Sequence, residues 1–133
     1  MRLWHQNLIP QLPRQQLLGQ WRECIALLGN GWGRKHKTVD YVFQHPESYL
    51  MAYSKKVYDE MTKRGYYPNL DRVQMALRKR LTYAEIEEQW NLMYQIIAKK
   101  PKNRIIYPEH NDSYYRECLE NLRLKGIEIE GGE

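Results

Sequence analysis

Glu23 is the residue of this sequence whose surroundings are most typical of a reactive carboxylate. The apolar residues Trp21 and Ile25 predict the inward face of a helix, which turns Glu23 toward the other side. Gly19 lies about one turn before Glu23 and Ala26 about one turn after it, so the predicted surface beside Glu23 is a shallow depression. A glycine inside a helix costs roughly 1 kcal/mol relative to alanine, which suggests that another molecule approaches the backbone there. The alternative is a solvated glutamate beside an accidental glycine, and the spacing leaves both interpretations open.

Three basic clusters are the second chemical feature of the sequence. They lie at predicted loops or helix ends, where basic side chains can follow a phosphate backbone. Each cluster also fits an ordinary solvated surface, but Trp32 and eleven tyrosines add rings of the kind that stack on bases. A net charge of +5 further favours a polyanionic partner. The clusters are Arg34, Lys35, His36 and Lys37, then Arg78, Lys79 and Arg80, then Lys99, Lys100, Lys102 and Arg104, of which we expect the first cluster and Arg104 to contact nucleic acid.

Apolar residues at helical spacing, with proline near helix starts and glycine near helix ends, predict the elements that must position these residues. No stretch alternates as a strand would, and the short apolar segment 39–43 fits either a helical turn or an extended link. We therefore expect an all-α fold: a single compact domain of about four to five helices over residues 1–126, with no sheet, followed by a flexible acidic tail at 127–133. The predicted helices lie at 13–29, 46–65, 70–80, 82–100 and 112–125.

Composition excludes several classes of protein. The apolar runs are only a few residues long and the N-terminus lacks the pattern of a secretory signal, so we expect a cytoplasmic protein without a membrane segment. Cys24 and Cys118 lie far apart, outside any metal-binding motif, and are expected to be reduced and buried. No two of the four histidines have the i, i+4 spacing of metal ligands on a helix. We therefore expect chemistry that uses no metal.

Two motifs resemble the pyrimidine-dimer DNA glycosylases. They are Leu-Ile-Pro-Gln-Leu at 8–12 and Gln-Gln-Leu-Leu-Gly-Gln-Trp-Arg-Glu at 15–23, which ends in the aromatic-Arg-Glu triplet of that family. Looser similarity continues through 36–43, 61–66 and 106–110, so that the resemblance covers nearly the whole chain. The Met-Arg-Leu-Trp opening is more similar to a bacterial branch than to the phage enzymes.

The resemblance implies an all-helical DNA repair enzyme that needs no cofactor. In this family a nucleotide is flipped from the duplex, and the N-terminal α-amine attacks the sugar C1′ as the base leaves. A Schiff base and strand cleavage follow. Because Arg2 is bulky, Met1 should be retained, so the nucleophile implied for this chain is the Met1 amine. An α-amine has an unperturbed pKa of about 7.7 to 8.0, so a substantial fraction is neutral and nucleophilic at cellular pH. Glu23 would stabilise the cationic sugar or imine and move the proton in the β-elimination.

The resemblance also gives Arg2 and Arg22 the role of holding flanking phosphates. It implies that the partner is damaged double-stranded DNA, and we expect a monomer that associates with the nucleoid when bound. The chain departs from the phage enzymes at Ala26 and Gln16, which stand where those enzymes have a basic residue and a histidine. Two alternatives remain: a nucleic-acid-binding protein that retains the fold without turnover, and an enzyme that acts on a modified or RNA nucleotide.

Overall fold

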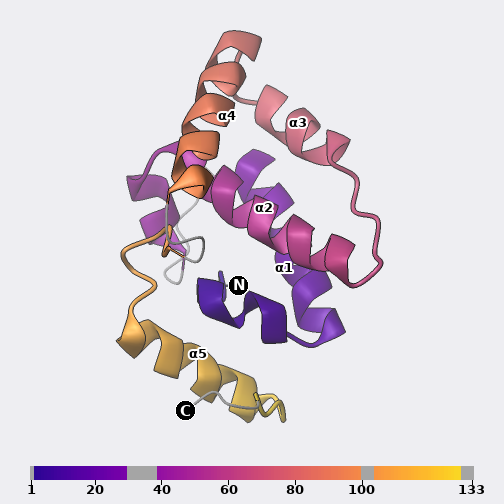
Figure 1. Ribbon diagram of the computed structural model, residues 1–133, viewed down its shortest axis with the longest axis vertical. Helices are drawn as coiled ribbons and strands as arrows, with labels where there is room; N and C mark the ends of the chain where they lie inside the picture. Colours follow the sequence, from indigo (N-terminus) through magenta and orange to yellow (C-terminus); the bar gives the residue numbers. More distant parts are fainter. Residues whose placement is uncertain (1, 30–38, 100–103, 130–133) are drawn as a thin grey trace.

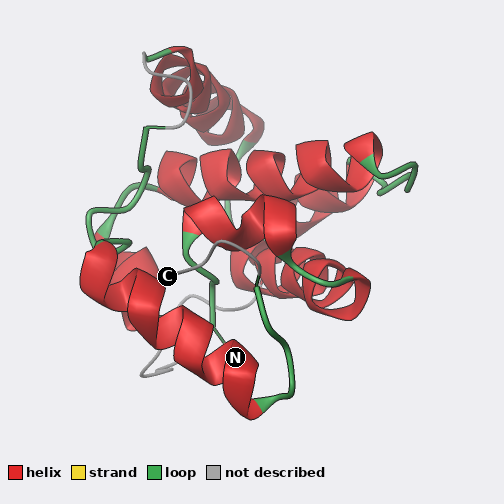
Figure 2. Ribbon diagram, turned by 60° about the horizontal axis from the view of Figure 1, so that its bottom comes forward, coloured by secondary structure: helices red, strands yellow, loops and turns green. Residues whose placement is uncertain are grey.

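The computed structural model describes residues 2–29, 39–99 and 104–129, and within these residues the chain consists of helices and loops without a strand (Figures 1 and 2). This confirms the predicted all-α class, and the five predicted helices correspond to α1 to α5. The open question at 39–43 is answered by a short 3-10 helix, η2, while a second 3-10 helix, η1, was not predicted. The elements are η1 (Gln6–Gln11), α1 (Arg14–Gly29), η2 (Asp40–Gln44), α2 (Glu47–Lys63), α3 (Asp71–Arg78), α4 (Tyr83–Ala98) and α5 (Asp112–Leu124).

The helix ends are set by local capping. The predicted capping box precedes α4: the Thr82 hydroxyl accepts from the Glu85 N–H at 3.2 Å, and the Glu85 carboxylate accepts from the Thr82 N–H at 2.9 Å. Asn111 caps α5 in the same way, by accepting from the N–H of Tyr114 at 2.8 Å. Gly65, after α2, has a φ of +91°, a conformation that lets the chain leave the helix at little cost.

The helix α2 lies in the middle of the fold and packs against α1 and α4, while α3 packs along α1 (Figure 1). The core is built from side chains of these helices together with Leu3, Leu8 and Leu12 of the N-terminal segment. The last helix, α5, lies apart from α3 and α4, next to η1 (Figure 1). This arrangement places the N-terminal segment between α1 and α5.

Both cysteines are free and buried, as predicted. Burial raises the pKa of the Cys24 thiol to about 12, so it remains a thiol. Ile127 and Ile129 are partly buried against the core, although they follow the predicted domain boundary at 126. Among the helices of the described residues, none is both long and apolar enough to cross a membrane.

Candidate active site

Glu23 lies in a polar pocket of about 380 Å³ on one side of α1. Its carboxylate is half-buried, and Oε1 is shielded from solvent. Gly19 lines this pocket, and among the described residues a Cβ added there would meet only Arg22 Nη2, at 3.8 Å. The packing of the described residues therefore leaves room for a side chain at Gly19, and the absence of one widens the pocket there. The lining residues are Arg2, Trp4, Gln16, Gly19, Gln20, Glu23, Asn121 and Lys125.

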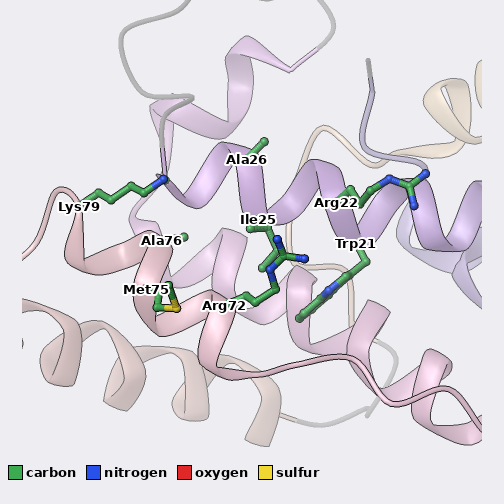
Figure 3. A pocket seen from close by; sticks show the side chains of 9 residues that line it. Trp21, Arg22, Ile25, Ala26, Arg72, Met75, Ala76 and Lys79 are labelled. Carbon is green, nitrogen blue, oxygen red and sulfur yellow. The ribbon is translucent and has the colours of Figure 1, made fainter.

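The predicted depression beside Glu23 is wrong in one respect, because Ala26 does not line this pocket. Ala26 lies instead in a second pocket of about 390 Å³ together with Ile25, between α1 and α3 (Figure 3). The reason is that α3 packs along that side of α1 and closes it off from Glu23. One helix thus borders two separate pockets.

Gln20 fixes the start of the chain beside Glu23. Its Oε1 accepts from the Trp4 N–H at 2.7 Å, and its Nε2 donates to the Arg2 carbonyl at 3.1 Å. The Tyr53 hydroxyl, on α2, lies 2.6 Å from the Trp4 carbonyl and 2.9 Å from Gln20 Oε1, and shares its proton between them. Burial raises the pKa of Tyr53 well above its ordinary value, so this hydroxyl stays a donor. Because Gln20 precedes Glu23 by about one turn, Arg2 is held at the Glu23 pocket.

The last helix holds the same segment from its other side. The Tyr114 hydroxyl donates to the Leu3 carbonyl at 2.5 Å. The Arg2 guanidinium pairs with Glu117 at 2.9 Å, lies over the ring of Tyr114 at 5.7 Å, and is only 16% exposed in its side chain. Arg2 therefore has an internal partner in this state, and its predicted contact with a phosphate stays a prediction.

A buried histidine lies beneath this segment. His110 Nδ1 accepts from the Gln6 N–H at 3.1 Å, and Nε2 lies 2.7 Å from the Tyr41 hydroxyl. Burial lowers the pKa of His110 to about 3, so the ring is neutral, and with Nδ1 as an acceptor the proton is assigned to Nε2. The neutral ring thus connects η1, through Gln6, to η2, through Tyr41.

The other predicted site residues are not gathered in the Glu23 pocket. Arg22 is exposed, lines the second pocket, and reaches back toward Gly19. Arg104 is exposed, and its carbonyl accepts from Gln6 Nε2 at 2.9 Å. The predicted nucleophile Met1 and the predicted contacts Arg34, Lys35, His36 and Lys37 lie outside the described residues.

The basic cluster at 78–80 is largely occupied by internal contacts. Arg80 donates to the carbonyls of Leu28 and Gly29 at the end of α1 and pairs with Glu47. Arg78 lies 4.6 Å over the ring of Tyr83. Lys79 lines the pocket between α1 and α3. Arg80 therefore has internal partners, and the interpretation of 78–80 as a phosphate-following cluster stays a prediction.

Sequence reasoning missed Trp4, Gln20, Asn121 and Lys125 as residues of the pocket. For Gln20 a signal existed, since a glutamine sits among apolar residues on α1 and precedes Glu23 by three positions. For Asn121 and Lys125 no signal existed, because nothing in the sequence brings α5 to α1. Within the described residues no group of three or more His, Cys, Asp or Glu side chains is placed to hold a metal ion. Independence from metals and cofactors stays a prediction.

The family model for pyrimidine dimer DNA glycosylases matches residues 1–74. The chain belongs to that family. The matched part contains the N-terminal segment, Gln20, Glu23 and Tyr53, whereas α4 and α5 lie beyond it. No curated protein and no solved structure matches the chain. Membership in the pyrimidine dimer DNA glycosylase family supports a glycosylase role in DNA repair, with damaged DNA as the partner.

Proposed function

We propose that this chain is a DNA glycosylase with abasic-site lyase activity that acts on pyrimidine dimers in duplex DNA. The observation that carries the proposal is the double hydrogen bond of Gln20 to Arg2 and Trp4, because it holds the start of the chain at the pocket of Glu23. Consecutive Cα atoms are about 3.8 Å apart, so an amine on the residue before Arg2 has only a short distance to cover to reach this pocket. We further propose that the protein acts as a monomer in the cytoplasm, on the nucleoid.

In the proposed reaction the neutral Met1 amine attacks C1′ of a flipped nucleotide. The C1′–N bond to the base breaks, and the base leaves with the electron pair and takes up a proton. The C1′–O4′ bond of the sugar then breaks, O4′ keeps the electron pair and takes the proton that the amine loses, and the C1′–N bond to the enzyme becomes an imine. Removal of a proton from C2′ then expels the 3′ phosphate from C3′. Glu23 stabilises the cationic intermediates and accepts the C2′ proton. Water finally hydrolyses the imine and frees the amine.

Borohydride trapping tests this proposal, because reduction of the imine leaves the protein covalently attached to DNA. We expect an adduct with duplexes that contain an abasic site or a cyclobutane dimer. Glu23→Gln should abolish strand cleavage with DNA affinity nearly unchanged, whereas Glu88→Gln, on the exposed surface of α4, should behave as the unaltered chain. Acetylation of the N-terminus should remove the adduct.

The abasic duplex tests the proposed lyase activity, and the dimer duplex tests the proposed substrate of the glycosylase. An adduct with the abasic duplex alone would leave a lyase and reject the dimer as substrate. If neither duplex yields an adduct, the chain is a DNA-binding member of the family without turnover, and the proposed chemistry is wrong.

A further inference from the structure

The second pocket, on the opposite side of α1 from Glu23, combines an apolar floor with a cationic rim. The floor is formed by Trp21, Ile25 and Met75, and the rim by Arg22, Arg72 and Lys79 (Figure 3). Met75 is 64% exposed, so its thioether is open to a ligand. Neither Asp nor Glu is among the described residues that line the pocket. The pocket therefore offers apolar contact and uncompensated positive charge together.

The three cations of the rim are free to bind. Within the described residues none of Arg22, Arg72 and Lys79 takes part in an ion pair, whereas Arg2, Arg64 and Arg80 each do. Keeping three like charges around one pocket costs electrostatic energy, and a bound anion relieves that cost. Charge complementarity thus indicates an anionic ligand.

The cations follow α1 in a row. Lys79 lies at one end, where its Cδ is 3.7 Å from an ideal Cβ on Gly29, and Arg22 lies at the other end, where its Nη2 is 3.8 Å from an ideal Cβ on Gly19. Arg72 lies between them (Figure 3). Ten residues of helix rise about 15 Å, so the row is too long for one phosphate and suits a chain of several.

We propose that this pocket binds a short single-stranded segment of DNA, with successive phosphates at Lys79, Arg72 and Arg22 and one unpaired base against the apolar floor. A thioether makes favourable contacts with aromatic rings, which gives the exposed Met75 a partner in the base. The base must be unpaired, because the faces of a base within a duplex are covered by its stacked neighbours. Met75, Ala76 and Lys79 lie beyond the family match at 1–74, so a third of the nine lining residues come from a part of the chain that the family model does not cover.

Binding of a 5′-phosphorylated trithymidylate to the intact chain tests the proposal, with inorganic phosphate and thymidine 5′-monophosphate as shorter probes. We expect the trinucleotide to bind most tightly and to shift the methyl resonance of Met75. Lys79→Gln should weaken it several-fold and reduce the slope of log K against log salt by about 0.7, the value for one contact with a single-strand phosphate. Arg123→Gln, which removes the same charge from the exposed surface of α5, should leave affinity and slope nearly unchanged.

Met75→Gln provides a second variant, because it removes the thioether without adding charge, Met75 is 64% exposed, and circular dichroism verifies the helices. It should weaken the trinucleotide more than inorganic phosphate, since only the former has a base. Equal weakening by Lys79→Gln and Arg123→Gln would show diffuse attraction and overturn the proposal. It would also be overturned if inorganic phosphate bound as tightly as the trinucleotide, or if an undamaged duplex shifted the Met75 methyl equally. None of these measurements requires turnover, so their failure is distinct from failure of the proposed lyase.

Discussion

Replacement of Gln20 by methionine tests whether the chain's start is positioned by this side chain. Methionine has a similar volume but no amide, so the Trp4 N–H and the Arg2 carbonyl both lose their partner while the space stays filled. Gln20 is 2% exposed, so water does not readily replace the lost hydrogen bonds. The Tyr53 hydroxyl retains its acceptor on Trp4, at 2.6 Å. The change is therefore confined to two main-chain groups of the N-terminal segment.

The stability loss follows from these two groups. A buried polar group left unsatisfied costs about 1–3 kcal/mol, and the Arg2 carbonyl is only partly buried, so we expect a total of about 2–4 kcal/mol. For a chain of this length that corresponds to a decrease in Tm of roughly 8 to 16 °C. Gln15→Met is the matched control, because Gln15 lies exposed on the same helix and its replacement should change Tm by little.

The consequence for catalysis is separable from stability. At a temperature where the Gln20→Met chain is fully folded, and at saturating abasic DNA, the rate of borohydride-trapped adduct formation should fall by about 10- to 100-fold, because a displacement of about 1 Å has that effect on a reacting group. The apparent affinity for DNA should change much less. An unaltered trapping rate in a destabilised Gln20→Met chain would refute the reasoning, since Gln20 would then support the fold without positioning the amine.

Three further outcomes are expected. Tyr53→Phe removes the donor shared by Gln20 and Trp4 and should lower the free energy of unfolding by about 1–2 kcal/mol in urea titrations, with a smaller loss of trapping rate than Gln20→Met. The pKa of His110 is lowered to about 3 in the folded state, so on acidification the unfolded chain binds a proton at this ring before the folded chain does. The contribution of His110 to the free energy of unfolding therefore falls as the pH drops below about 6.5, the ordinary pKa of histidine. NMR titration of the folded chain should find the ring neutral down to pH 4.5. Arg80→Met should cost about 3 kcal/mol or more, since it leaves buried Glu47 without this partner, and a change below 1 kcal/mol would contradict that role.

The sequence predicted the helices well because their signals are local. The spacing of apolar residues, the capping box of Thr82 and Glu85, and the glycines at 65 and 126 each act within a few residues. The short helix η1 was missed because a distant segment anchors it: Gln6 donates to the carbonyl of Arg104 and accepts from the N–H of Ile106. Such contacts span about a hundred residues and leave no periodic pattern.

The residues of the candidate site also fall into those with local sequence signals and those placed by long-range contacts. Glu23 was identified from its own helix and from the family triplet, both of which are local. The tether of Arg2 and Trp4 to Gln20 was not predictable, because it needs the N-terminal segment to cross α1 and Tyr53 to approach from α2. Ala26 was misplaced since helical spacing alone does not reveal which side of α1 is covered by α3.

The role of α5 explains why a family match that ends at residue 74 does not by itself complete the pocket. Residues 1–74 supply Glu23 and the Gln20 tether, yet the other wall of the pocket comes from Asn121 and Lys125. The same helix pairs Glu117 with Arg2 and donates from Tyr114 to Leu3, so the segment before Trp4 is held from two opposite sides. A chain end held on one side alone keeps much of its conformational freedom, which would oppose a fixed geometry at the amine that we propose as the nucleophile. The contacts of α5 with Arg2 and Leu3 therefore help to position the start of the chain.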